Sequence, residues 1–451
     1  MRRALVLLAA VLLAGAAAPA AGAADRIVTV RGVDGPGPAA TDRVRVLQQG
    51  PARARKVLVL MPGTSAGAAS LRPAARLLLA RLKGWQVWSV DRRENALEDH
   101  GVLDEALAGR VTGQALFDHY LGWIGNDAVA THFQPVADDA VPYARAWGMA
   151  TAIGDLRQVV RRARRGGRTV VLGGHSLGGT IVTAYATWDF GGGRAGARDL
   201  AGLVYIDGGS SRGALTAADA RTQLAALQTG SPFLDLTGLG LSWSAGVFNA
   251  VGSTLALEEP DAPSLLQAWP FLPAALKPPV PVTNAAGYGY AVDTETGPAS
   301  LRLVQMHLGS LAASGDPRPW ADGGLATVRR AATVFAGVES LDGTSWYHPR
   351  RLSLDGGAVN GGVRAPAQRV LGLRTTRARA AQLPIYAFAA ALGGERVLRA
   401  ARALARRAGV PRRRVVLVDR SATYAHVDPL AAGPRRNDFV STVVPFLRRI
   451  R

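Results

Sequence analysis

Alternating and clustered apolar positions divide the chain into short strands and helices. Residues 26–31 and 43–47 alternate apolar and polar side chains, as edge strands do, and the Gly-Pro-Gly-Pro run at 35–38 separates them. Compact apolar runs predict buried strands elsewhere. These runs occupy residues 56–61, 85–90, 169–172, 200–206, 384–388 and 415–418.

Helical stretches separate these strands. They are predicted at residues 71–82, 143–165, 180–187, 397–408 and 438–449. Strands that alternate with helices favour a mostly parallel sheet covered by helices on both faces, which is an α/β architecture.

The pattern breaks between residues 210 and 382. An interval of about 170 residues is too long for a loop in a compact domain, so it predicts a cap inserted after the sixth strand. We therefore expect four parts: residues 1–24, 25–209, 210–382 and 383–451. Aromatic residues in the insertion have no clean period and are expected to shape an apolar pocket. They are Trp243, Phe248, Trp269, Phe271, Trp320, Trp346 and Tyr347.

Composition fits a globular protein with a sizeable core. Of the 451 residues, 48% are hydrophobic and 19% are charged. The formal charge is +20, and only Lys56, Lys83 and Lys277 of the basic residues are lysines. A positive charge can attract anionic partners. However, the arginines are scattered and no nucleic-acid motif accompanies them, so no nucleic-acid partner is expected.

Residues 1–24 have the order of a secretory signal peptide. Arg2 and Arg3 precede an apolar stretch at 4–16, and small residues at 21–23 offer a cleavage site. The apolar stretch is short for a membrane span, so no stable span is expected. The chain has no cysteine, which excludes disulfides and a lipid-anchored thiol. A secreted, extracytoplasmic protein is expected.

Residues 168–180, RTVVLGGHSLGGT, hold the main chemical motif. The segment from Gly174 to Gly178 fits G-x-S-x-G between a strand and a helix, which is the arrangement of a nucleophile elbow. Side chains at the two glycines would collide with neighbouring elements. Ser176 is therefore predicted to be a nucleophile. The alternative is a serine that only caps the helix.

This motif, with the strands and helices around it, resembles the α/β-hydrolase superfamily of the esterase and lipase type, with a large cap. The resemblance covers roughly residues 42–210 and 380–451. It implies the chain order serine, acid, histidine and a catalytic histidine in the loop after the last strand, where His426 stands. His307 and His348 fall in the insertion, and the side chain of His175 is expected to point away.

Two carboxylates remain candidates for the acid. Asp207 ends the strand after the elbow, where some lipases and dehalogenases of this fold carry it. Glu395 follows the seventh strand, the commoner position, although the usual Gly-x-x-Asp-like pattern is missing there. Asp207 is favoured. Asp428 is interpreted as a loop-forming residue.

The oxyanion donors are expected to be two backbone N–H groups, those of Leu177 and Thr64. The pattern before Thr64 reads Pro62-Gly63, with proline in place of the usual histidine. Residues 91–95 either line the pocket or form a salt-bridged loop, which is favoured. No metal-ligand cluster, P-loop or dinucleotide fingerprint is evident, so no metal or cofactor is expected.

Together these features predict a secreted serine hydrolase that cleaves carboxylic esters through an acyl-enzyme. Its partner would be a small-molecule ester with an apolar, lipid-like group. Two alternatives remain open: a peptidase or amidase with the same triad, and a non-catalytic binding protein on the hydrolase scaffold.

Export predicts a mature chain that lacks roughly its first 23 residues, because cleavage follows the small-residue site. N-terminal sequencing of exported protein checks this. A mature chain that begins at Met1 would contradict it.

Overall fold

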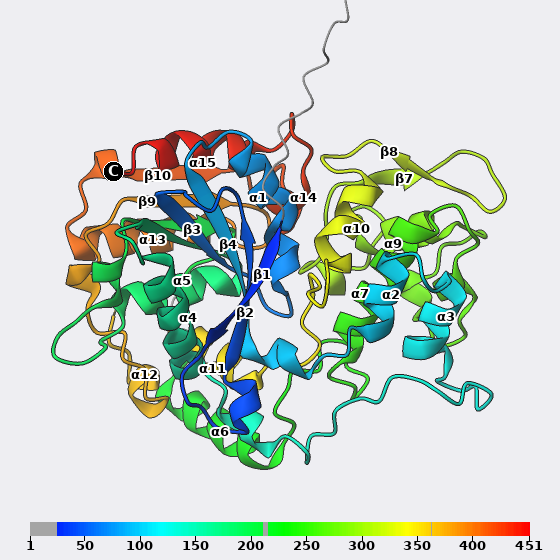
Figure 1. The fold of residues 1–451 in the computed structure, drawn as a ribbon, viewed down its shortest axis with the longest axis horizontal. Helices are drawn as coiled ribbons and strands as arrows, with labels where there is room; N and C mark the ends of the chain where they lie inside the picture. The colour runs from blue at the N-terminus through cyan, green and yellow to red at the C-terminus, as the bar shows by residue number, and fades with distance from the viewer. Residues whose placement is uncertain (1–24, 211–214, 362) are drawn as a thin grey trace, which may run out of the picture.

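An eight-stranded sheet forms the centre of the larger lobe in the computed structural model (Figure 1), which describes residues 25–210, 215–361 and 363–451. The sheet order is β1-β2-β4-β3-β5-β6-β9-β10. Its strands are β1 (Arg26–Arg31), β2 (Arg43–Gln49), β3 (Lys56–Met61), β4 (Trp85–Asp91), β5 (Thr169–His175), β6 (Gly202–Ile206), β9 (Ile385–Ala389) and β10 (Val415–Asp419). The proposed signal segment, residues 1–24, lies outside the described residues.

The strand directions match the predicted architecture. β2 runs antiparallel to both β1 and β4, whereas the pairs from β4 through β3, β5, β6 and β9 to β10 are parallel. Parallel strands end at one edge of the sheet, so the loops after β3, β5, β6, β9 and β10 gather there. This edge carries the candidate active site.

Side chains on the strands alternate between two cores. In β3, Val57, Val59 and Met61 pack into the core that includes α4 and α5, while Leu58 and Leu60 pack into the core that includes α1 and α15. Both faces of the sheet are therefore buried under helices, as expected for parallel strands. The predicted α/β fold class is confirmed.

The helices cover the sheet and build a second lobe. They are α1 (Arg72–Leu79), α2 (Gly101–Leu107), α3 (Gly113–Phe117), α4 (Met149–Ala163), α5 (Leu177–Thr187), α6 (Ala217–Thr229), α7 (Ser244–Glu258), α8 (Leu265–Ala268), α9 (Asn284–Val292), α10 (Val328–Ala336), α11 (Arg350–Ala358), α12 (Pro366–Val370), α13 (Glu395–Ala408), α14 (Asp428–Ala431) and α15 (Asp438–Arg448). The predicted helix at 143–165 starts later, because Gly148 is extended before α4.

The second lobe, on the right of Figure 1, is built from two separate parts of the chain. Helices α7, α9 and α10 and the hairpin of β7 (Gly309–Leu311) with β8 (Trp320–Asp322) come from the interval between β6 and β9. Helices α2 and α3 come from the segment after β4, to which the sequence analysis assigned no element. In contrast, α11 and α12 pack against the sheet core. The domain boundaries at 210 and 382 stay a prediction.

The aromatic residues of the insertion were expected to shape an apolar pocket, but four of them are buried in a core instead. Trp243, Trp269, Trp346 and Tyr347 are at most 6% exposed. They pack with aromatic residues of the segment after β4 into a separate apolar core. These side chains are buried by a segment distant in the sequence and not by one face of their own helix or strand. Their spacing along the chain therefore follows no helical or strand period, and it did not reveal their burial. Phe271 is exposed.

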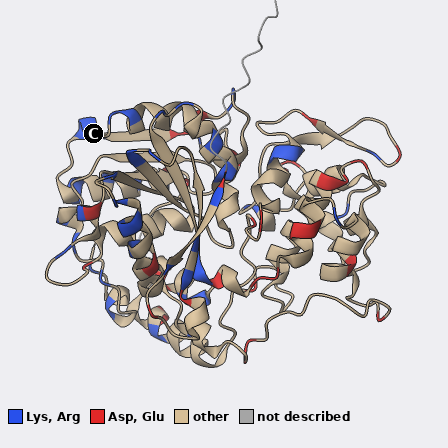
Figure 2. Cartoon of the chain, viewed as in Figure 1, with Lys and Arg blue, Asp and Glu red and all other residues tan. Residues whose placement is uncertain are grey.

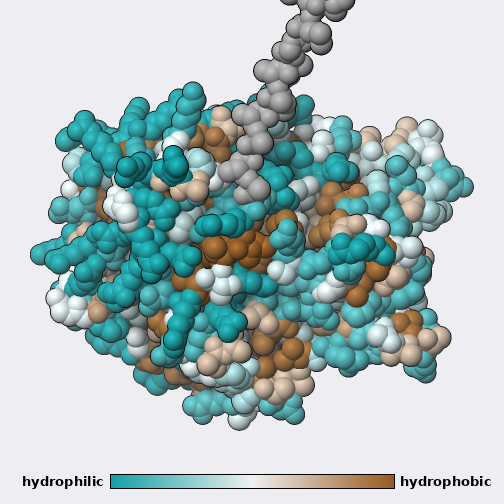
Figure 3. Space-filling view, in the orientation of Figure 1, coloured by the Kyte–Doolittle hydropathy of each residue, from teal (hydrophilic) through white to brown (hydrophobic). Residues whose placement is uncertain are grey.

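Charged residues are distributed differently over the two lobes. Lys and Arg residues lie mainly on the lobe that holds the sheet, and acidic residues are more evident on the second lobe (Figure 2). Apolar residues gather near the middle of the same face (Figure 3). In the described parts of the chain, every helix is too short or too polar to span a bilayer.

Candidate active site

Ser176 occupies a strained turn between β5 and α5. Its backbone angles, φ 54° and ψ −124°, are rarely adopted by residues other than glycine, and they hold the serine at the start of the helix. The flanking glycines are sterically required. A Cβ at Gly174 would lie 2.2 Å from the carbonyl carbon of Gly178, and a Cβ at Gly178 would lie 2.2 Å from the Met61 oxygen. The sequence segment thus folds into the expected elbow.

Asp207 and His426 form a buried pair beside this elbow. Asp207 directly follows β6, and its Oδ2 lies 2.6 Å from His426 Nδ1. Their side chains are 0% and 2% exposed. Because a carboxylate only accepts, Nδ1 carries the proton and donates it to Asp207. In this tautomer Nε2 is the acceptor atom of the ring.

The loop after β9 supplies further hydrogen bonds to the same carboxylate. The backbone N–H groups of Ala390 and Gly393 donate to Asp207 Oδ1 over 2.8 and 3.1 Å. Burial opposes ionisation, but the hydrogen bonds from His426 and Ala390 outweigh it and hold the pKa of Asp207 below its usual range. Asp207 is therefore both ionised and fixed in position.

Glu395, the other candidate acid, lies apart from this pair. It begins α13, its side chain is 60% exposed, and its carboxylate lies 3.4 Å from Arg399. The segment after the seventh strand of the main sheet thus contributes backbone donors to the site. Between the two candidates, the geometry favours Asp207 as the partner of His426.

The expectation that His175 points away from the site was wrong. Its Nε2 lies 2.9 Å from the backbone oxygen of His426, and the two rings are 4.3 Å apart. Burial, followed by the neighbouring His426, lowers the pKa of His175 to about 3. A neutral His175 can donate Nε2–H to that carbonyl, which fixes the backbone that carries His426.

Asp428 connects the loop of His426 to His307 of the insertion. Its Oδ2 lies 2.6 Å from His307 Nδ1, and its Oδ1 accepts the His307 backbone N–H over 3.0 Å. Oδ2 also accepts the N–H of Ala425. The hydrogen bond to Asp428 raises the pKa of His307. Asp428 therefore does more than form a local turn: it joins the histidine loop to the segment before β7.

The loop that carries Thr64 passes directly beside the serine. A Cβ at Gly63 would lie 2.9 Å from Ser176 Cβ, so only glycine allows this approach. Thr64 is half-buried, as are Ser176 and Leu177. The N–H of Leu177 belongs to the first residue of α5, where the helix dipole favours negative charge.

Arg92 orients this loop, a role that the sequence analysis missed. Its guanidinium is 4% exposed, pairs with Glu94, and donates to the carbonyls of Pro62 and Gly63 over 3.3 and 3.1 Å. Because the peptide unit is planar and trans, a Gly63 carbonyl turned toward Arg92 turns the Thr64 N–H away from it. Burial of a strand-end arginine is not readable from local sequence.

Beyond Arg92, the 91–95 segment forms a salt-bridged loop, which was the favoured interpretation over pocket lining. Arg93 donates to Asp155 and to Asp42 over 2.8 Å each, and all three side chains are buried. Arg93 thereby ties the loop after β4 to α4 and to the N-terminal strands.

The insertion holds the other side of the Thr64 loop. Ser65 has a positive φ of 49°, and its N–H donates to Nδ1 of His348 over 3.3 Å. Ser65 Oγ donates to the Ser345 carbonyl, and the Ser345 N–H donates back to the Ser65 carbonyl. Burial and then the nearby Arg92 lower the pKa of His348, so it accepts this bond in its neutral form. The loop is thus clamped between Arg92 and residues 345–348.

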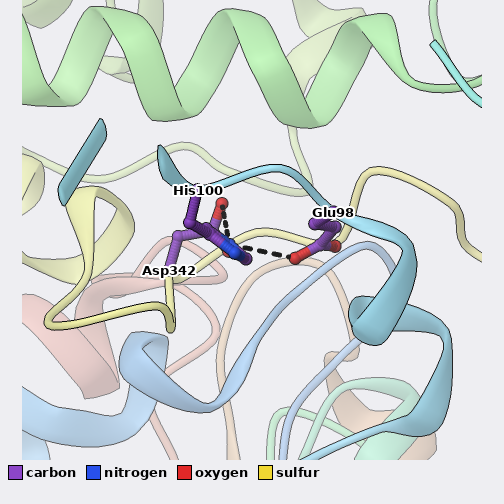
Figure 4. Close-up of side chains that lie close together, drawn as sticks. All are labelled: Glu98, His100 and Asp342. Atoms are coloured by element: carbon purple, nitrogen blue, oxygen red, sulfur yellow. Dashed lines mark ion pairs between the residues drawn. The ribbon is translucent and has the colours of Figure 1, made fainter. Parts of the chain in front are cut away.

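Three further side chains near this loop have the donor atoms of a metal site. Glu98, His100 and Asp342 each offer one ligand atom, and these atoms all lie within 4.8 Å of one another (Figure 4). Burial and the charge of Asp342 raise the pKa of Glu98 to about 8. The expectation of no metal cluster overlooked this group because Asp342 is remote in sequence. The Glu-x-His spacing at 98–100 was the one local signal.

No protein-family model matches the chain, and no curated protein matches it significantly. Among solved structures, a candidate lipase from Sulfolobus solfataricus is 14% identical, with a TM-score of 0.49 and coverage of 95% of this chain and 94% of its own. Epoxide hydrolase A from Mycobacterium thermoresistibile is 16% identical, with a TM-score of 0.43 and coverage of 95% and 99%. A thermophilic esterase from Thermogutta terrifontis is 12% identical, with a TM-score of 0.37 and coverage of 94% and 99%.

Likenesses at such identities identify no reaction. The sheet order and the strained serine elbow described above, however, are those of the α/β-hydrolase fold, which this chain therefore has.

Proposed function

We propose that this protein is a serine hydrolase that cleaves carboxylic esters through an acyl-enzyme. The observation that carries the proposal is the 2.6 Å contact between Asp207 and His426 next to the strained Ser176. A serine hydroxyl is a weak nucleophile until a base takes its proton, and an acid-held neutral imidazole is such a base.

Each residue has one task in the proposed reaction. His426 Nε2 takes the Ser176 proton while Oγ attacks the ester carbonyl carbon. The oxygen of the tetrahedral intermediate accepts hydrogen bonds from the backbone N–H groups of Thr64 and Leu177. Collapse breaks the bond to the alcohol, which receives the proton from His426. Water then attacks the acyl-serine by the same steps, and Asp207 stabilises the imidazolium each time it forms.

The identity of the nucleophile favours acyl transfer over epoxide opening. Attack by a serine hydroxyl on an epoxide carbon would leave a serine ether, which water does not cleave under mild conditions. Attack on an ester leaves a serine ester, which the same base and oxyanion donors can hydrolyse. A turnover cycle through Ser176 therefore requires an acyl group.

The choice of ester over amide rests on leaving-group chemistry. An alcohol leaves more readily than an amine, so the triad is expected to act faster on esters. Matched ester and amide substrates with the same acyl group separate this proposal from a peptidase or amidase. Four aromatic residues of the insertion are buried in a core, so they give no reason to expect an apolar group in the substrate. Export, supported by the residue order at 1–23, belongs to the same proposal.

Ser176→Ala is expected to lower kcat for ester hydrolysis by about 10⁶, the size of the loss when a triad nucleophile is removed. Labelling by a fluorophosphonate should disappear as well, because the reagent needs the activated hydroxyl. The measurements are initial rates and gel detection of the labelled protein. Ser441→Ala is the matched control, since Ser441 is an exposed serine of α15. Persistent labelling of Ser176→Ala contradicts the proposal.

Asp207→Asn is expected to lower kcat by about 10⁴, because an amide in place of the carboxylate favours the wrong imidazole tautomer. Glu395→Gln should cost at most about tenfold, the lower end of the range for an outer-shell change. Steady-state kinetics on one ester, with far-UV circular dichroism to show that both variants fold, compare them. A larger loss in Glu395→Gln would assign the acid to Glu395.

A further inference from the structure

Three buried polar side chains lie close together outside the candidate active site. They belong to Glu98, His100 and Asp342. Their side chains are 1%, 7% and 2% exposed. Glu98 and His100 follow β4, whereas Asp342 lies in the segment after α10. Figure 4 shows both carboxylates turned toward the same edge of the His100 ring.

Two of the three ligand atoms lack a hydrogen-bond partner in the part of the chain that the structure describes. Among the described residues, neither Glu98 Oε2 nor His100 Nε2 makes a hydrogen bond, although the two atoms lie only 3.2 Å apart. A buried polar atom without a partner is costly. If His100 Nε2 carried a proton directed at Glu98 Oε2, the two atoms would form a hydrogen bond. If instead both atoms direct a lone pair at the same point, neither can bond to the other, and a metal ion at that point would satisfy both.

The spacing of the three atoms fits a tetrahedral metal ion. With metal–ligand bonds of roughly 2.0–2.2 Å, neighbouring ligands of tetrahedral zinc lie roughly 3.3–3.6 Å apart. His100 Nε2 lies 3.2 Å from Glu98 Oε2 and 3.7 Å from Asp342 Oδ2. The third pair also lies within 4.8 Å. These separations bracket the tetrahedral value.

Hydrogen bonds from neighbouring residues orient both carboxylates. Glu98 Oε1 accepts the Trp346 backbone N–H over 2.8 Å, which leaves Oε2 to face His100. Asp342 Oδ2 accepts Thr344 Oγ1–H and Trp346 Nε1–H over 2.8 Å each, and Oδ1 accepts the Thr344 N–H. Outer hydrogen bonds of this kind fix the ligands of metal sites.

The charge of the cluster also favours a divalent cation. Glu98 and Asp342 carry two negative charges when ionised, and a divalent cation with a neutral imidazole balances both. One nitrogen and two oxygen ligands at tetrahedral spacing suit Zn²⁺ better than Ca²⁺ or Mg²⁺, which prefer more ligands and oxygen alone. We propose that Glu98, His100 and Asp342 bind one divalent cation of the zinc class, with water as the fourth ligand.

The position of this ion indicates a structural role. The backbone oxygens of Asp342 and Gly343 accept hydrogen bonds from the N–H groups of Ala69 and Gly67 over 3.1 and 3.0 Å, so the Asp342 segment lies against the loop that follows Thr64. A bound ion would join this segment to the chain after β4. The ion therefore joins the two chain segments that build the second lobe, and the backbone of Asp342 and Gly343 connects this junction to the loop that follows Thr64.

Metal binding by the full chain tests the proposal directly. Protein stripped with EDTA is loaded with Zn²⁺, freed of excess metal, and analysed by mass spectrometry for zinc content. The wild type should retain one equivalent, and Glu98→Gln and His100→Gln should bind at least about tenfold more weakly. Zn²⁺ should raise the thermal midpoint of the wild type but not of these variants. Co²⁺ should give the visible absorption of a tetrahedral site.

His119→Gln is the matched control, because His119 lies 3.8 Å from Asp99 and outside the cluster. It should retain the full equivalent. Ca²⁺ and Mg²⁺ at the same concentration should leave the thermal midpoint unchanged. Wild type that retains no zinc, or equal zinc in the wild type and in Glu98→Gln and His100→Gln, would overturn the site and leave an ion pair between His100 and the two carboxylates. Neither readout uses ester hydrolysis, so the test is independent of the proposed reaction.

Discussion

The carboxylate of Asp207 is the point on which the arrangement of the site depends. It receives three hydrogen bonds from residues distant in the chain, those of His426, Ala390 and Gly393. Burying a charged carboxylate costs several kcal/mol of desolvation free energy unless hydrogen bonds compensate it. Asp207 can therefore stay ionised in the interior only while these donors remain in place. The residue after it packs as closely: a Cβ at Gly208 would lie 2.0 Å from the Ser176 carbonyl oxygen. Asp207, the loop of His426 and the turn of Ser176 therefore hold each other in position.

The same edge of the sheet depends on a second buried charge. Arg92 turns the carbonyls of residues 62 and 63 inward, while residues 345–348 hold the following Ser65. The insertion thus reaches both sides of the site, through Ser65 at the Thr64 loop and through His307 and Asp428 at the histidine loop. We infer that these contacts from the segment between β6 and β9 stabilise the geometry of the site.

Local sequence was enough for the elbow and for the strands around it, because the strand, the tight turn and the helix are adjacent. The choice between Asp207 and Glu395 could not be made in this way. It depends on backbone donors in the loop after β9, which lie 183 and 186 positions beyond Asp207. His175 was misjudged for a related reason: its partner is a backbone carbonyl of the histidine loop, which no residue pattern encodes. The buried aromatics and the Glu98–His100–Asp342 group likewise arise where distant segments meet.

The central claim is that Ser176, His426, Asp207 and the two backbone donors act as one unit. A crystal structure of the enzyme after reaction with an alkyl fluorophosphonate tests this most directly, since the adduct resembles the tetrahedral intermediate. We predict phosphorus bonded to Ser176 Oγ and a phosphoryl oxygen about 2.7–3.1 Å from the N–H groups of Thr64 and Leu177, with His426 still paired to Asp207. Phosphorus on another residue, or a phosphoryl oxygen directed away from both N–H groups, would contradict the account.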